Sequence, residues 1–189
     1  QNNFSNNDVL FFYGGIIGHA QGLDIILHTA EQVKEHKNIK FILLGSGPEK
    51  EKLLAIKKEL KLEQVYFFEP VPKSKMPEII KSIDAAIIPL KKIDLFLGAI
   101  PSKIFEVLSM KKPIILGVDG EAKELFIDKG NCGVYYEPEN TTELKKAILS
   151  LYNSNELIQT YGDNGRQFVE KYFNRDNIAK DFNKELINI

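Results

Sequence analysis

IPSKIFEVLSMKKPIILG, at residues 100–117, predicts a short amphipathic helix followed by an apolar strand. Pro101 suits the first turn of this helix, because a residue there has no intrahelical partner for an N–H group. Ser102 and Lys103 follow in the same turn, and Glu106 lies on the same helix face as Lys103. A helix N-terminus attracts anions and disfavours cations, so we interpret Lys103 either as a partner for a bound diphosphate or as a solvated surface lysine.

Apolar runs and amphipathic segments alternate along most of the chain. Six apolar runs have the length of buried strands, and they lie at residues 9–13, 40–44, 65–68, 84–90, 113–118 and 133–136. Helices are predicted between them, the first at residues 23–36. Side-chain N-caps are predicted at Ser46, Ser74 and Asn140.

This alternation predicts an α/β fold, a doubly wound parallel sheet of the Rossmann-like kind with helices on both faces. Two C-terminal helices, at residues 156–172 and 175–187, follow the last strand. Pro89 is expected near the end of its strand, because proline cannot donate to a central ladder. Ligands bind such sheets at the carboxyl ends of the strands, so a ligand site is expected in the loops at that edge.

A glycine-rich loop, GGIIGHAQG at residues 14–22, follows the first predicted strand. Gly14, Gly15 and Gly18 let the backbone approach a ligand closely. Their spacing differs from G-x-G-x-x-G, so the loop is not a dinucleotide-binding fingerprint.

The composition is that of an ordinary globular domain. The chain has 189 residues, 43% of them hydrophobic, and its net charge of -1 argues against a nucleic-acid partner or a polybasic membrane patch. A single cysteine, Cys132, excludes a disulfide framework and fits a reducing cytoplasm. The three scattered histidines do not predict a metal site, and no apolar run approaches the length of a membrane span.

The chain resembles the C-terminal half of retaining sugar-nucleotide glycosyltransferases of family 4, which have the two-domain GT-B fold. Five segments carry the resemblance in the same order, and they read GGIIGHAQGLDIIL, FILLGSGPEKEKL, PSKIFEVLSMKKPIIL, GEAKEL and CGVYYEPENTTELKKAI. The likeness is closest to the bacterial branch that builds O-antigens and capsules, including N-acetylfucosamine transferases.

The resemblance implies that residues 9–189 form a domain that binds a nucleotide-sugar donor, with a UDP-sugar expected. The polar stretch QNNFSNND at residues 1–8 is predicted to be a linker. An N-terminal domain holds the acceptor in this family, and nothing of that length precedes Val9 here. The chain is therefore expected to be half of an enzyme, which binds donor but does not transfer sugar alone.

The resemblance also assigns the glycine loop to the donor diphosphate and sugar. The family commonly places an arginine and a lysine around this loop, where this sequence has Ile16, His19 and Gln21. Lys103 is the expected replacement, and His19 could contribute when it is protonated. The predicted diphosphate and sugar site comprises Gly14, Gly15, Gly18, His19, Gln21, Pro101, Ser102 and Lys103.

The family's paired acidic motif has two glutamates separated by seven residues. Glu106 matches the second, which holds the ribose, and the first position is Gly98, so one sugar contact is absent or supplied differently. Val71 and Pro72 are expected to meet the base through backbone groups. Glu124 is interpreted as a sugar contact or as a surface residue.

No residue of this chain is predicted to be a catalytic base or nucleophile. The resemblance implies a retaining hexosyl or N-acetylhexosaminyl transfer assisted by the donor phosphate, with no metal and no cofactor. The protein then positions the reactants and stabilises the leaving diphosphate. The expected acceptor is a glycan or lipid-linked glycan of surface polysaccharide synthesis, handled in the cytoplasm or at the inner face of the cell membrane.

Two other functions remain open from the sequence. One is half of a UDP-sugar 2-epimerase, which shares the two-domain fold but relies on acidic and histidine residues in its cleft. The other is a non-catalytic domain that has lost its donor site, as Gly98 and the missing loop cations would suggest.

Overall fold

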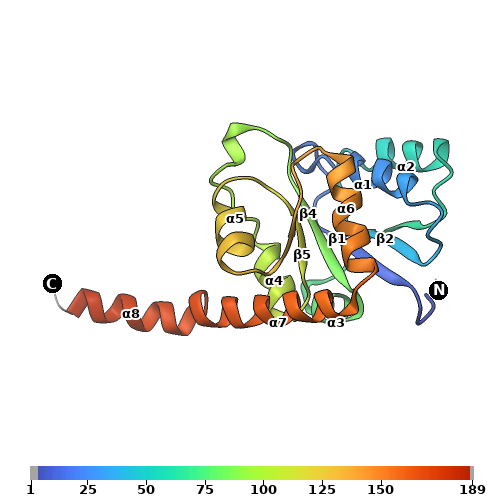
Figure 1. Cartoon of the computed structure of the whole chain (residues 1–189). Helices are drawn as coiled ribbons and strands as arrows, with labels where there is room; N and C mark the ends of the chain where they lie inside the picture. Colours follow the sequence, from blue (N-terminus) through green and yellow to red (C-terminus); the bar gives the residue numbers. More distant parts are fainter. Residues whose placement is uncertain (1–3, 188–189) are drawn as a thin grey trace.

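Six parallel strands form the centre of the protein in a computed structural model that describes residues 4–187 (Figure 1). The strands are β1 (Val9–Gly14), β2 (Ile39–Leu44), β3 (Val65–Phe68), β4 (Ala85–Pro89), β5 (Ile114–Gly117) and β6 (Gly133–Tyr135). Their order in the sheet is β3-β2-β1-β4-β5-β6, with all neighbours parallel. The predicted α/β doubly wound sheet is confirmed. Residues 1–3 of the predicted linker and residues 188–189 lie outside the described residues.

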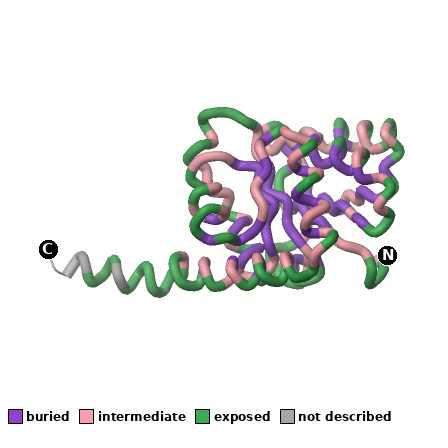
Figure 2. Tube along the Cα trace, viewed as in Figure 1, coloured by how far each residue is buried: buried purple, intermediate pink, exposed green. Residues whose placement is uncertain are grey.

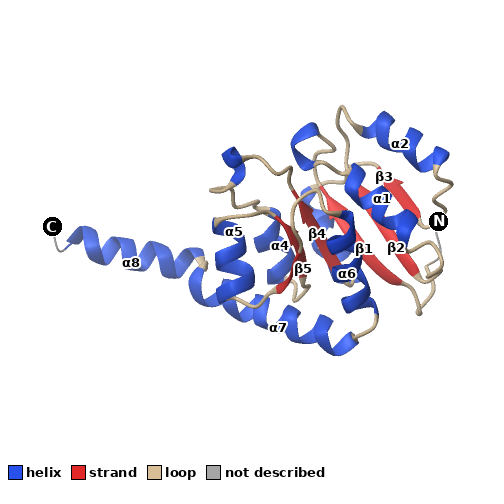
Figure 3. Ribbon diagram, turned by 45° about the horizontal axis from the view of Figure 1, so that its top comes forward, coloured by secondary structure: helices blue, strands red, loops and turns tan. Residues whose placement is uncertain are grey.

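Helices cover both faces of the sheet, as Figure 3 shows. Successive residues of β1 point to opposite faces, so Phe11 and Tyr13 lie in one core and Phe12 in the other. The first core includes side chains of α1, α2 and α6, and the second includes side chains of α3, α4 and α7. Figure 2 shows the buried residues, in purple, along the middle of the domain.

The helices and helical turns follow the predicted alternation. They are η1 (His19–Gln21), α1 (Asp24–Gln32), α2 (Lys50–Glu59), η2 (Lys73–Lys75), α3 (Met76–Ser82), η3 (Asp94–Phe96), α4 (Lys103–Ser109), α5 (Glu121–Lys123), η4 (Glu124–Lys129), α6 (Thr141–Tyr152), α7 (Asn155–Tyr172) and α8 (Arg175–Ile187). The segment η4 is a π-helical turn that continues α5. Pro89 is the last residue of β4, as predicted.

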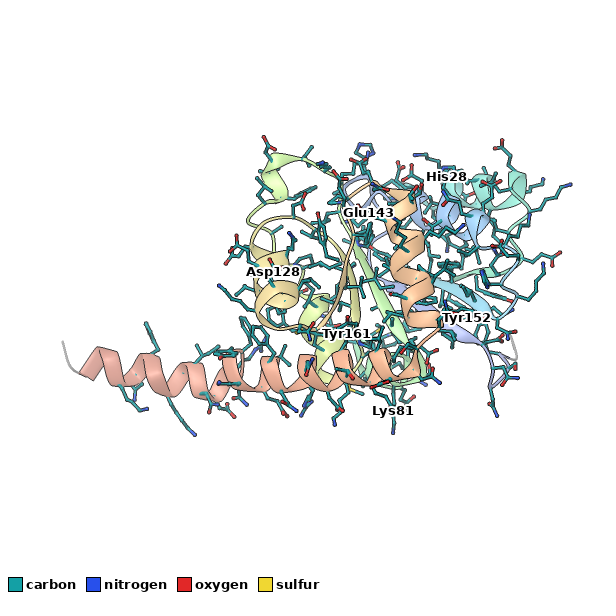
Figure 4. The ribbon with its side chains drawn as sticks, in the orientation of Figure 1. His28, Lys81, Asp128, Glu143, Tyr152 and Tyr161 are labelled. Carbon is teal, nitrogen blue, oxygen red and sulfur yellow. The ribbon has the colours of Figure 1, made fainter. Side chains whose placement is uncertain are left out.

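The first helix is shorter than the predicted 23–36. It ends at Gln32, because the N–H groups of Val33 and Lys34 bond to carbonyls three residues back and tighten the chain into a turn. His28 lies exposed on this helix (Figure 4).

Two predicted N-caps are wrong. The helix α2 begins at Lys50 without a side-chain cap, because Ser46 and Glu49 lie in a loop whose backbone pairs with Ile17. Ser74 lies inside the turn η2, and the following α3 has no side-chain cap either. The Asn140 cap is confirmed, since its side chain accepts a hydrogen bond of 3.1 Å from the N–H of Glu143. Figure 4 shows Glu143 on the first turn of α6.

The two C-terminal helices behave differently. The helix α7 packs closely on the domain, where a Cβ at Gly162 would lie 2.2 Å from the carbonyl oxygen of Lys111. The helix α8 extends away from the domain (Figures 1 and 2), with Ile178 52% and Phe182 63% exposed. Among residues 4–187, no helix has both the length and the apolar character needed to cross a membrane.

Candidate functional site

The loops that follow β1 and β2 are joined by their backbones at the carboxyl edge of the sheet. The N–H of Ile17 donates to the carbonyl of Ser46 at 2.8 Å, and the carbonyl of Ile17 accepts from the N–H of Glu49 at 3.1 Å. Gly45 has a φ of 156°, and a Cβ there would lie 1.8 Å from the carbonyl oxygen of Gly15. Only glycine allows this approach, which sets the position of the glycine loop.

Lys103 points from the first turn of α4 toward the glycine loop. Its Nζ lies 4.1 Å from the centre of the Tyr13 ring, within cation–π range. A Cβ at Gly15 would lie 2.9 Å from the same Nζ, so the ammonium is directly beside the loop. The Tyr13 hydroxyl donates to the carbonyl of Ile16 at 2.5 Å. Tyr13 therefore contacts both Lys103 and the glycine loop.

Burial lowers the pKa of Lys103 from 10.5 to about 8, and the nearby Glu106 carboxylate partly opposes this shift. Among the described residues, no carboxylate oxygen lies within the 4.0 Å of an ion pair with Lys103. An ammonium that is still mostly protonated at neutral pH is thus held in a partly buried position without a close counter-ion. Such an arrangement favours the arrival of an anion.

Glu106 lies one helical turn beyond Lys103 on the same face, as predicted, and is exposed. A small cavity between the end of β1 and α4 is lined by Gly14, Lys103 and Glu106, together with Met76 of α3. The structure therefore brings three predicted site residues together at the point where the sheet order reverses between β1 and β4.

The segment around Pro101 and Ser102 differs slightly from the prediction. The helix α4 begins at Lys103, with Ser102 as an N-cap residue that makes no side-chain capping bond. Pro101 precedes it and accepts a hydrogen bond of 3.0 Å from the N–H of Ile104, so it belongs to a tight entry turn. Ser102 is exposed beside the helix.

The second half of the glycine loop forms the turn η1 and carries His19 and Gln21. The side chain of Gln21 folds over Gly18, where an added Cβ would meet its amide oxygen at 2.8 Å. His19 is exposed, and its Nε2 lies 2.9 Å from the Nζ of Lys91, which comes from the loop after β4. A cation therefore reaches this part of the loop from a distant point in the sequence.

Other predicted site residues lie apart from the Lys103 cavity. Val71 packs against the second core and lines a groove on the β2–β3 side of the sheet, and Pro72 is exposed in the following loop. Gly98 is exposed, with no atom within 4 Å of an added Cβ. Glu124 is exposed at the start of η4. None of these four residues lines the cavity of Lys103 and Glu106.

Two residues of this edge were missed by sequence reasoning, Tyr13 and Lys91. Tyr13 reads as an ordinary strand residue, and Lys91 reads as one of many surface lysines. The sequence signal for Lys91 was its place two residues after the end of a strand, at the carboxyl edge of the sheet. In residues 4–187, no group of three or more histidine, cysteine, aspartate or glutamate side chains is arranged to hold a metal ion.

The open parallel sheet, with its strand order and its glycine loop at the switch point, defines a doubly wound Rossmann-like domain. The family model for glycosyl transferases group 1 matches residues 1–168, and the chain belongs to this family. The resemblance to sugar-nucleotide glycosyltransferases is confirmed at that level.

Individual relatives agree with this family. An uncharacterized glycosyltransferase of Methanocaldococcus jannaschii is 26% identical over 182 residues, which are 96% of this chain and 45% of that protein. WcaI of Escherichia coli, provisionally named as a colanic acid biosynthesis glycosyl transferase, is 22% identical over 94% of this chain and 42% of its own length. The chain thus spans less than half the length of these relatives.

The crystal structure of HepE from Anabaena, solved with UDP and glucose, superposes with a TM-score of 0.82 at 18% identity. The match covers 97% of this chain and 49% of HepE. The fold is therefore that of one half of a GT-B glycosyltransferase.

Proposed function

We propose that this chain is the donor-binding domain of a retaining glycosyltransferase that uses a UDP-sugar. The observation that carries the proposal is the Lys103 ammonium, which lies against Tyr13 and Gly15 at the switch point of the sheet without a close counter-ion among the described residues. An anionic ligand supplies the missing charge, and a diphosphate bound beside the exposed Gly15 would lie within reach of the Lys103 ammonium. The crystal structure of HepE holds UDP and glucose, which supports the choice of nucleotide.

The residues of the site receive separate roles in this proposal. Lys103 donates hydrogen bonds to the diphosphate, and the exposed Glu106, three residues further along the same helix, accepts from the ribose hydroxyls. The backbone around Val71 and Pro72 meets the base. Gly98 and Glu124 mark the side where the sugar lies, and the open space at Gly98 leaves room for it.

Catalysis in the proposed enzyme depends on positioning and on charge stabilisation. Negative charge accumulates on the diphosphate as its bond to the sugar breaks, and a lysine in a partly buried position stabilises this charge more than it would in water. The reaction as proposed routes no step through a metal or a cofactor. The domain holds donor and leaving group, so we expect no transfer by the domain alone.

We propose that the acceptor is bound by a separate N-terminal domain, because the chain spans less than half of its relatives. Residues 1–8 would then be the linker between the two. The proposed acceptor is a glycan or lipid-linked glycan of surface polysaccharide synthesis, at the cytoplasmic face of the membrane. The name of WcaI supports this pathway without specifying the acceptor or the sugar.

The proposal is tested by titrating UDP into the chain and following heat or amide NMR shifts. Lys103→Met is expected to weaken UDP binding about tenfold or more, the usual contribution of a hydrogen bond from a charged group. Glu106→Ala should weaken UDP several-fold but affect free pyrophosphate little. Lys146→Met is the matched control, because it removes an exposed lysine of α6, which covers the sheet face opposite α4.

Unchanged UDP affinity in both site variants would contradict the assignment of the site. Failure of the unaltered chain to bind any nucleotide would favour the non-catalytic alternative. Family membership favours a transferase over an epimerase, and the full-length protein can be tested directly by incubation with UDP-N-acetylglucosamine without acceptor. Epimerisation under those conditions would contradict the transferase proposal.

A further inference from the structure

Lys91 begins the loop after β4 and is attached to the glycine loop by its backbone and its side chain. Its N–H donates to the carbonyl of Ala20 at 3.0 Å. Its Cγ would lie 3.2 Å from a Cβ at Gly22, so the aliphatic stem passes over the end of the loop. Its Nζ lies 2.9 Å from His19 Nε2. The side chain is therefore held across the second half of the glycine loop.

The environment of Lys91 differs from that of the next residue. Lys92 forms an ion pair with Glu137, and its N–H donates to Glu139. Among the side chains that the structure describes, no carboxylate lies within 4.0 Å of Lys91 Nζ, whose close partner is the His19 ring. An ammonium has three N–H donors, and a neutral imidazole nitrogen uses one of them without cancelling the charge. Lys91 thus keeps donors and charge available at the ligand edge.

A diphosphate carries more negative charge than one ammonium can balance. Lys103 lies at the Gly15 end of the glycine loop, whereas Lys91 lies at the Gly22 end. The two lysines lie at opposite ends of the β4–α4 connection, with Lys91 two residues after β4 and Lys103 at the first residue of α4. Their placement provides two cations on two sides of one glycine loop.

We propose that Lys91 is a second binding residue for the donor diphosphate, held in position by His19, an inference that rests on the proposed function. When the diphosphate binds, the Lys91 ammonium donates to its oxygens from the Gly22 side while Lys103 donates from the Gly15 side. Lys91 then binds the diphosphate in place of a cation within the glycine loop, although Lys91 is distant from that loop in sequence.

The matched pair Lys91→Met and Lys92→Met tests this inference, because both variants remove one positive charge from adjacent positions. UDP and UMP are titrated into each variant and into the unaltered chain. Lys91→Met is expected to weaken UDP binding about tenfold, the contribution of one hydrogen bond from a charged group. The loss should be smaller for UMP, because Lys103 alone can serve a single phosphate. Lys92→Met should change UDP affinity less than twofold, and Lys91→Arg should recover most of the binding.

Equal UDP affinities for the two methionine variants would overturn the role of Lys91. If Lys103→Met still weakened UDP in that case, the proposed function would stand while this inference fell. An unaltered chain that binds no UDP would overturn both. Thermal unfolding of each variant shows whether the fold is intact. If Lys91→Met does not fold, the UDP affinity of Lys91→Arg provides a second test.

Discussion

The ring of Tyr13 lies under the ammonium of Lys103 at 4.1 Å, while its hydroxyl donates to the Ile16 carbonyl at 2.5 Å. Tyr13 is 1% exposed and belongs to the first core, so its ring is fixed by packing. One buried side chain therefore sets the distance between the proposed diphosphate-binding lysine and the glycine loop.

Substitutions of Tyr13 should separate its two contacts. Tyr13→Phe keeps the ring face and is expected to retain UDP affinity within about twofold, while the lost hydrogen bond lowers the free energy of unfolding by about 1 kcal/mol. Tyr13→Leu also removes the cation–π contact, and we expect UDP to bind about fivefold more weakly. Urea denaturation and UDP titration measure the two effects, and equal UDP affinities in both variants would contradict a role for the ring.

The affinity for UDP should depend on pH through Lys103. Its pKa in the ligand-free protein is about 8, and a bound diphosphate favours the charged form and raises that pKa. UDP binding is therefore expected to weaken as the pH rises above 8, by up to tenfold per pH unit. Calorimetry near pH 8 in buffers of different ionisation enthalpy should detect proton uptake, which Lys103→Met should remove.

The same lysine should limit the stability of the ligand-free domain. The pKa of Lys103 is lower in the folded protein than its ordinary 10.5, so the unfolded chain binds more protons between about pH 8 and 10.5, and stability rises with pH across that window. Lys103→Met is expected to raise the free energy of unfolding at pH 7 by about 1–2 kcal/mol, because it removes the cost of a partly buried charge. Chemical denaturation at pH 7 and pH 10 checks this. A Lys103→Met variant less stable than the unaltered chain at pH 7 would show that burial of the Lys103 ammonium does not destabilise the fold.

Gly45 should be essential for the packing of the loops after β1 and β2 at the carboxyl edge of the sheet. Gly45→Ala places a Cβ 1.8 Å from the Gly15 carbonyl oxygen. This clash can be relieved only if the backbone moves. We expect a loss of about 3 kcal/mol or more in the free energy of unfolding. Gly98→Ala, where no atom lies within 4 Å of the new Cβ, is the control and should change stability by less than about 0.5 kcal/mol. Similar stabilities for the two variants would contradict the close approach of the two loops.

The sequence by itself determined the six strands, their alternation with helices and the cap at Asn140. These features depend on periodicity and on bonds between residues three or four apart, which can be read locally. Short strand–helix connections also determined that the loops gather at one edge of a parallel sheet. For the same reason, Lys103 and Glu106 could be placed on one helix face before the fold was known.

Only the tertiary structure decided which residues meet across that edge. Ser46 fails as a cap because its backbone pairs with Ile17 on another loop, and no local pattern records that partner. Lys91 reaches His19 across 72 positions of sequence, and Tyr13 acquires its contact with Lys103 only when β1 and α4 are brought together. Such contacts arise from the order of strands in the sheet, which brings distant segments within a few ångströms. For this reason, the sequence predicted the edge of the sheet where the site is proposed, and the fold decided which side chains meet there.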